Sequence, residues 1–168
     1  KPGHEQDIFK NPYIAYNCLQ VVGERCVVSN GSHTDIIVGK LADGVPPRDA
    51  LVGTLHNMDY EHDSLNTPRI AGTVERNSSQ GFLGIVTKHS LHVTAIDLTP
   101  GRAWYVATYE HDVPGDSYSD SDFDVADADA ACQYILGEGV FADLERPITA
   151  ACGVATDDGY DIAVSNKV

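Results

Sequence analysis

The chain has 168 residues, of which 25 are Asp or Glu and 11 are Lys or Arg, for a formal net charge of −14. This length is typical of one domain with a single hydrophobic core, so we expect residues 1–168 to form one domain. The negative charge excludes duplex nucleic acid as a partner, because nucleic-acid binding needs a basic surface. No apolar run approaches the about 20 residues of a membrane span, which excludes a membrane protein and predicts a cytoplasmic one.

The acidic composition also favours a halophilic protein, because concentrated salt screens the repulsion among surface carboxylates; a mesophilic acidic protein is the alternative. The seven histidines form no HExxH motif and the four cysteines form no CxxC motif. The sequence therefore predicts no metal site and no other cofactor. In a reducing cytoplasm we expect the cysteines to be free and buried.

The N-terminal part predicts a β-hairpin. Residues 13–22 and 26–29 have the composition of strands, with Gly23-Glu24 as the turn between them. In that hairpin Cys26 lies opposite Val21. Cys18 then falls on the other face of the sheet, so the two thiols cannot form a disulfide.

Two helices are expected next. The first runs from Ser32 to near Gly44, and the second opens at Pro46-Pro47. The apolar stripe of the second helix consists of Leu51, Leu55 and Met58. The polar segment that follows, from Asp59 to Arg69, fits neither a strand nor a helix.

The second half predicts mostly strands. The expected strands are 69–75, 81–87, 91–98, 103–109, 148–155 and 160–164. Residues 112–124 read as an exposed acidic loop and residues 126–137 as a helix. Hairpins with helices between them favour an α+β fold of two mostly antiparallel sheets with helices outside.

The stretch Ser29–Asp35 (SNGSHTD) interrupts a strand just before the first helix. In a purely structural interpretation, Ser32 caps the helix, with Asp35 completing a weak capping box. Asn30-Gly31 would then supply the positive φ angles of the turn. In a functional interpretation, the free N–H groups of the helix start and the nearby hydroxyls hold a phosphate. The residues alone leave both interpretations open.

Three further segments are candidates for chemistry. Tyr13 and Tyr16 point to opposite faces of a strand, so one of them is able to line a cleft. Residues 59–63 gather acidic side chains at the end of a helix. Arg69 is either a partner for an anionic ligand or an ion-pair partner for that acidic cluster.

Together these segments resemble the archaeal-type IMP cyclohydrolases. The motifs that carry the resemblance are NPYIAYNC, VVSNGSHTD, MDYE, NTPRIAG, LGIVT and TYE. They occur in order along essentially the whole chain. The resemblance implies a four-layer α-β-β-α fold similar to that of the N-terminal-nucleophile (Ntn) hydrolases. It also implies closure of 5-formamidoimidazole-4-carboxamide ribotide (FAICAR) to IMP with loss of water, the last step of purine biosynthesis.

The same resemblance implies the catalytic residues. They are the second tyrosine of NPYIAYNC, Tyr16, and the glutamate of MDYE, Glu61. We assign proton transfer to Glu61 and a hydrogen bond to the formyl oxygen to Tyr16, although the sequence allows these roles to be exchanged. From the residues themselves we expect contacts with FAICAR or IMP from Asn17, Ser29, Asn30, Gly31, Ser32, His33, Thr34 and Arg69. Homo-oligomerisation stays open.

Two alternatives and one departure accompany this interpretation. Members of the family carry an arginine-rich N-terminal segment before the position of Lys1, so we expect a chain that is N-terminally truncated relative to the family. A non-catalytic protein that binds purine nucleotides is therefore the alternative function. An amidohydrolase of the Ntn type is disfavoured, because such enzymes need an N-terminal Cys, Ser or Thr and residue 1 is Lys1.

Overall fold

A computed structural model describes residues 15–115, 118–144 and 146–167, which form a mixed α and β structure with antiparallel sheets. The strands are β1 (Leu19–Val22), β2 (Arg25–Ser29), β3 (Arg69–Glu75), β4 (Gln80–Val86), β5 (Leu91–Asp97), β6 (Ala103–Trp104), β7 (Ser119–Asp120), β8 (Thr149–Ala155) and β9 (Tyr160–Asn166). The helices are α2 (His33–Ala42), α3 (Pro47–Met58), α4 (Ala128–Ile135) and a short 3-10 helix η1 (Gly139–Phe141).

The largest sheet has the strand order β1-β2-β3-β4-β5. Its first hairpin has the predicted register, with Val21 opposite Cys26 and the carbonyl of Cys18 accepting a hydrogen bond from the Ser29 N–H. All four cysteines are free, as predicted. The expectation that all of them are buried was wrong for Cys18, which is exposed because it lies just before the edge strand β1.

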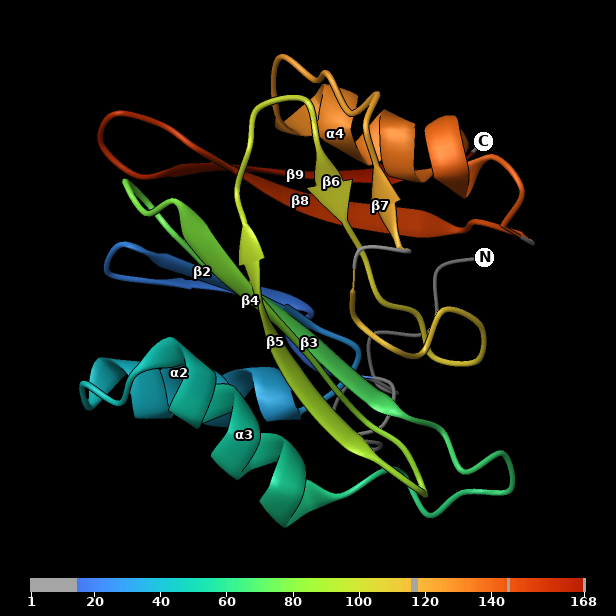
Figure 1. Ribbon diagram of the computed structural model, residues 1–168. Helices are drawn as coiled ribbons and strands as arrows, with labels where there is room; N and C mark the ends of the chain where they lie inside the picture. The colour runs from blue at the N-terminus through green and yellow to red at the C-terminus, as the bar shows by residue number, and fades with distance from the viewer. Residues whose placement is uncertain (1–14, 116–117, 145, 168) are drawn as a thin grey trace.

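Helices α2 and α3 cover one face of this sheet (Figure 1). The core between helices and sheet consists of Val27, Ile37, Leu41, Ala50, Leu51 and Ala71. Leu51 and Leu55, from the predicted apolar stripe of α3, are fully buried. Gly84 on β4 allows this close packing, because a Cβ at that position would lie 2.7 Å from Cδ1 of Leu55.

The hairpin β8–β9 lies on the other side of the five-stranded sheet, and α4 packs on the hairpin (Figure 1). A second, smaller core holds α4 and the hairpin together. Its buried members are Ala131, Cys132, Leu136, Ala150 and Cys152. The start of β3, the loop after α3 and the first turn of α2 meet at one end of the five-stranded sheet.

Three expectations for the second half of the chain were wrong. The described strands form three sheets instead of two, because β6–β7 and β8–β9 each pair separately. The strand expected at 103–109 is limited to Ala103–Trp104. The expected exposed acidic loop contains β7, whose Asp120 is buried. This carboxylate accepts hydrogen bonds from the Tyr134 hydroxyl and the Val140 N–H, which satisfy it in the interior. Residues 13–14 of the first expected strand lie outside the described residues.

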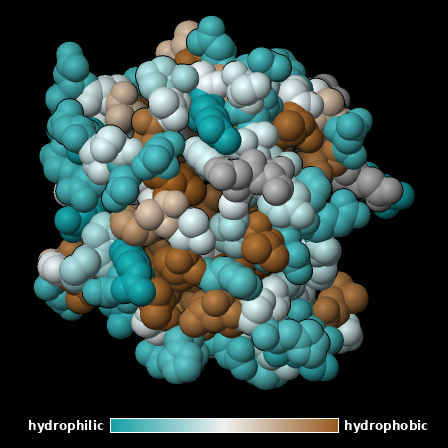
Figure 2. All heavy atoms as spheres, in the orientation of Figure 1, coloured by the Kyte–Doolittle hydropathy of each residue, from teal (hydrophilic) through white to brown (hydrophobic). Residues whose placement is uncertain are grey.

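The surface fits the acidic composition. Figure 2 shows a face that is mostly hydrophilic, with apolar patches separated by polar residues. Within the described parts of the chain, no helix is both long and apolar enough to cross a membrane.

Candidate active site

Arg69 and Glu61 form an ion pair where the loop after α3 meets the start of β3. The Arg69 Nη1 donates to Oε1 of Glu61 at 2.9 Å, and its Nε donates to the carbonyl of Asp59 at 2.9 Å. The two side chains are only 10% and 19% exposed. Of the two interpretations of Arg69, the structure therefore shows the ion pair with the acidic cluster.

The loop between α3 and β3 holds Glu61 in place. Asp59 has φ 56° and ψ −179°, a conformation that residues other than glycine rarely adopt. The Glu61 N–H donates to the carbonyl of Thr67 at 2.8 Å. Asp63 accepts hydrogen bonds from Leu65 and Thr67, and the bonds from Thr67 hold the pKa of this exposed carboxyl below its usual range. The loop is thus closed on itself by backbone and side-chain contacts.

Tyr16 lies close enough to Glu61 for the charge of this carboxylate to affect it. Burial raises the pKa of its hydroxyl, and so do the nearby groups of Cys18 and Glu61. Tyr16 is exposed, at 37% of its surface, and no described residue forms a hydrogen bond with its hydroxyl. The next residue, Asn17, donates to Oδ1 of Asp35 at 3.1 Å, and Gln20 donates to the same atom. These bonds attach the Tyr16 segment to the first turn of α2.

The turn at Ser29–Thr34 satisfies most of its own polar groups. The Ser29 hydroxyl lies 2.5 Å from that of Thr34 and 3.0 Å from the carbonyl of Gly31. Ser32 occupies the N-cap position, but the predicted cap was wrong, because its side chain forms no capping hydrogen bond. The expected capping box is also absent, because Asp35 binds Asn17 and Gln20 instead.

Asn30 and His33 attach the same turn to β3. The Asn30 side chain donates to the carbonyl of Pro68 and accepts from the Ile70 N–H. The Nε2 of His33 lies 2.9 Å from the carbonyl of Ile70. A carbonyl only accepts, so Nε2 carries the proton and Nδ1 is an acceptor. This Nδ1 is buried and has no partner among the described residues.

The charge state of His33 follows from its surroundings. The ring is fully buried. Burial lowers the pKa of His33 and the Arg69 guanidinium lowers it further, while the hydrogen bond to Ile70 acts in the opposite direction. The imidazole is therefore neutral at neutral pH.

Gly31 lies where His33 and Arg69 approach the backbone. A Cβ at this position would be 2.9 Å from Nδ1 of His33 and 3.1 Å from Nη1 of Arg69. The prediction that Asn30-Gly31 supplies positive φ angles was wrong, since neither residue has one. The chain needs glycine here for space, not for backbone conformation.

The structure therefore brings most of the predicted residues to one place. Tyr16, Glu61, Arg69, Gly31 and His33 lie together, whereas the hydroxyls of the turn bind to the turn itself. Two contacts at this place were not predicted from the sequence. Asp35 positions Asn17, and the Tyr109 hydroxyl lies 2.9 Å from that of Thr67. The TYE motif pointed to Tyr109, but the sequence held no signal for its partner.

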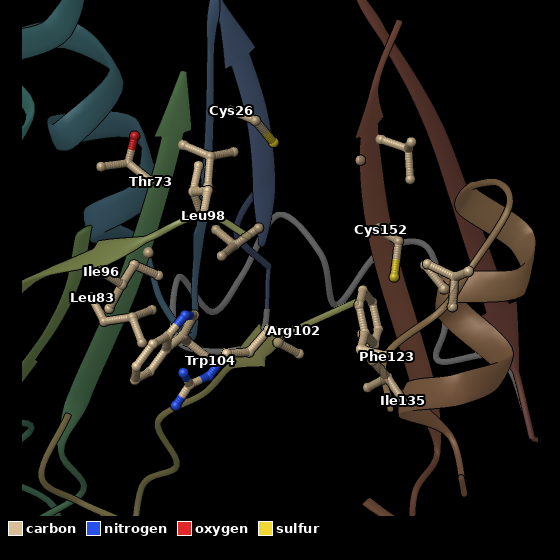
Figure 3. A pocket seen from close by; sticks show the side chains of 18 of the residues that line it. Cys26, Thr73, Leu83, Ile96, Leu98, Arg102, Trp104, Phe123, Ile135 and Cys152 are labelled. Carbon is tan, nitrogen blue, oxygen red and sulfur yellow. The ribbon is translucent and has the colours of Figure 1, made fainter. Parts of the chain in front are cut away.

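A cavity of about 430 Å³ lies elsewhere, between the five-stranded sheet and the β8–β9 hairpin. Figure 3 shows Cys26 and Cys152 facing it from its two sides. Its described lining is apolar apart from Thr73 and one charged residue, Arg102, which stacks on Trp104 at 4.2 Å and donates to Ser119. None of the residues around Glu61 lines it. The described residues contain no group of three or more side chains suited to hold a metal ion.

Comparisons with known proteins agree on one family. A family model described as IMP cyclohydrolase-like protein matches residues 1–159. A Methanosphaera stadtmanae protein named IMP cyclohydrolase is 41% identical over 164 residues, which cover 98% of this chain and 77% of that protein. A protein of the same name from Methanocella arvoryzae is 40% identical over 165 residues, with the same coverage of 98% and 77%. A third, from Methanococcus maripaludis, is 38% identical over 162 residues, covering 96% and 77%.

Proposed function

Because the chain belongs to the IMP cyclohydrolase family, a family of enzymes, we propose that it closes FAICAR to IMP and releases water. The observation that carries this proposal is the meeting of Tyr16, Glu61 and Arg69, on top of the family match. The motifs that hold these three residues are separate in the sequence. They meet because the loop after α3 returns to β3 beside the segment that precedes β1.

The reaction joins two groups of one molecule. The carboxamide nitrogen bonds to the formyl carbon and loses one proton, and the formamido nitrogen loses another as it forms a double bond to the same carbon. The formyl oxygen gains both protons and departs as water. Because both partners are already in the substrate, the protein has to orient them and move protons. None of the steps requires a metal or another cofactor.

We assign the proton transfer to Glu61. Its carboxylate has one oxygen on Arg69 and a largely buried position, both of which fix its direction. Tyr16 then donates a hydrogen bond to the formyl oxygen as negative charge develops there. Burial raises the pKa of Tyr16 further above neutral pH, so its hydroxyl carries the proton that this hydrogen bond needs.

The phosphate of the substrate is assigned to the start of α2. The N–H groups of Ser32 and His33 have no backbone partner within the described residues, and they point out of the positive end of the helix. Asn17, Asn30 and Gly31 frame this place, and Ser29 and Thr34 shape the turn behind it. The neutral ring of His33 is buried and offers only an acceptor, so we do not assign it to the phosphate.

The wider expectations belong to the same proposal. We assign residues 1–168 to one domain of the four-layer, Ntn-hydrolase-like kind, supported by helices α2 and α3 on one sheet and α4 on the β8–β9 hairpin. The enzyme would act in the cytoplasm, in concentrated salt. Neither nucleic acid nor a membrane is a partner in it.

A turnover assay tests the proposal. The purified chain is mixed with FAICAR in molar salt, and IMP formation is followed by absorbance and chromatography. We expect IMP at a rate well above the uncatalysed one. IMP binding without any turnover would instead support the non-catalytic nucleotide-binding alternative.

Calorimetry with IMP and inosine tests the phosphate position separately. The two compounds differ only in the phosphate, so a phosphate site predicts much weaker binding of inosine at fixed salt. Equal affinities would contradict this placement without touching the catalytic assignment.

A further inference from the structure

Arg69 was expected to contact the substrate, but its described hydrogen bonds all go to the protein. Nε binds the Asp59 carbonyl and Nη1 binds Glu61, and only 10% of the side chain is exposed. A guanidinium holds its donors in a rigid plane, so these two bonds fix the orientation of the whole group. Arg69 therefore has the contacts of a residue that holds other residues in position.

What Arg69 holds is the candidate proton carrier. Its Nη1 donates a hydrogen bond to Oε1 of Glu61, so the second carboxylate oxygen is left to exchange a proton. Its Nε binds the carbonyl of Asp59, two residues before Glu61, where the backbone has the unusual φ of 56°. One side chain thus fixes both the carboxylate and the strained backbone that leads to it.

The turn at Gly31 packs against Arg69. The Nη1 of Arg69 would be only 3.1 Å from a Cβ at Gly31, and the buried Nδ1 of His33 would be 2.9 Å from the same point. Because Arg69 lowers the pKa of the buried His33, the imidazole near it is neutral and adds no repulsion to the guanidinium, whereas a protonated ring would. The packing therefore leaves Arg69 little room to turn away from Glu61.

We propose that Arg69 is a positioning residue, which holds one oxygen of Glu61 so that the other is presented to the substrate. This inference rests on the proposed function, because it gives Glu61 the proton-transfer role. It departs from a substrate-contact role for Arg69, and the two roles predict different kinetics.

The variant Arg69→Gln tests the inference, with kcat, KM for FAICAR and the Kd for IMP all measured. Misplacing a catalytic group by about 1 Å lowers rates about 100-fold, so we expect kcat to fall by about that factor. KM and Kd should change by less than about threefold, because ground-state contacts are kept. Arg69→Lys keeps the charge but not the two directed bonds, and we expect a fall in kcat of about tenfold.

A weakened Kd and raised KM, by tenfold or more with kcat unchanged, would show that Arg69 contacts the ligand and would overturn the inference. Unchanged kcat, KM and Kd in Arg69→Gln would overturn it as well. Arg76→Gln is the matched control, because Arg76 also binds one glutamate and one backbone carbonyl. It should lose stability but keep kcat.

If the unmodified chain shows no turnover, the proposed function fails first, and IMP binding still tests the role of Arg69. A positioning residue leaves the Kd of Arg69→Gln within about threefold of the unmodified value. Circular dichroism on each variant confirms that the protein compared is folded.

Discussion

Strand β3 begins at Arg69 and is followed directly by Arg76. The two arginines make the same two kinds of contact, one with a glutamate and one with a backbone carbonyl. Arg69 binds Glu61 and the carbonyl of Asp59, and Arg76 binds Glu24 and the carbonyl of Thr156. Both guanidinium groups are largely buried, with side-chain exposures of 10% and 13%. A tyrosine with a raised pKa accompanies each pair, Tyr16 at one end and Tyr160 at the other.

The two ends differ in what surrounds the carboxylate. Glu24 is 53% exposed and Glu61 only 19%. The Tyr160 hydroxyl donates to the carbonyl of Glu24, which joins the β1–β2 turn to the β8–β9 hairpin. The Tyr16 hydroxyl has no such partner among the described residues. We infer that the Arg76 end joins two hairpins, whereas the Arg69 end holds a sheltered carboxylate within electrostatic reach of the Tyr16 hydroxyl.

Replacing the two glutamates gives the largest expected difference. Glu61→Gln should lower kcat about 10²- to 10⁴-fold, because it removes a proton carrier and keeps the shape of the side chain. Glu24→Gln should leave kcat unchanged, since its carboxylate faces solvent. IMP formation measures both. Equal losses of turnover, or Glu61→Gln retaining more than about a tenth of the rate, would erase the distinction between the two ends.

Replacing the two tyrosines gives a smaller difference. Tyr16→Phe should lower kcat by about tenfold to a hundredfold, because one hydrogen bond to the developing charge is lost. Tyr160→Phe should instead lower the free energy of unfolding by about 1 kcal/mol, through the lost bond to Glu24, with kcat unchanged. Kinetics and urea unfolding on both variants measure the two effects. If Tyr16→Phe keeps the original kcat, the Tyr16 hydroxyl has no role in the mechanism.

Local sequence patterns predicted much of the fold. The turn at Gly23-Glu24 set the register of the first hairpin, and the apolar stripe of α3 set its buried face. The strand expected at 103–109 was wrong because apolar residues there belong to a loop, in which Tyr105 packs on His111, Tyr118 and Phe141. Alternation along a short segment does not distinguish a strand from a loop that packs aromatic side chains.

The candidate site was harder to predict, because its geometry depends on contacts between distant segments. The resemblance implied Tyr16 and Glu61, but the role of Arg69 depends on the loop that returns from Asp59 to β3. For Gly31 the sequence rule for turns predicted a positive φ. The actual reason is the approach of His33 and Arg69 from other elements, which no local pattern contains.

Gly31→Ala tests how closely the turn at Gly31 packs against Arg69. The added methyl would meet His33 at 2.9 Å and Arg69 at 3.1 Å, so both side chains have to shift. We expect a loss of about 1–3 kcal/mol in the free energy of unfolding, together with a lower kcat. Gly39→Ala, in the helix that follows Gly31, is the control, because nothing lies within 4 Å of its new Cβ, and it should gain up to about 1 kcal/mol. Equal unfolding energies for the two variants would contradict the crowding at Gly31.

The smallest expected effect concerns Ser32, the residue after Gly31. Its side chain forms no capping bond, so Ser32→Ala should change the free energy of unfolding by less than about 0.5 kcal/mol. Ser29→Ala should lower it by about 1 kcal/mol, because the Ser29 hydroxyl binds Gly31 and lies against that of Thr34. Urea unfolding at fixed high salt separates the two variants. A loss of 1 kcal/mol or more in Ser32→Ala would mean that the hydroxyl caps α2 in solution after all, as about that loss is typical of an N-cap.

If the stability of Ser32→Ala is unchanged, weaker binding of IMP by this variant reports a contact between the hydroxyl and the ligand. That contact would lie at the start of α2, where we place the phosphate.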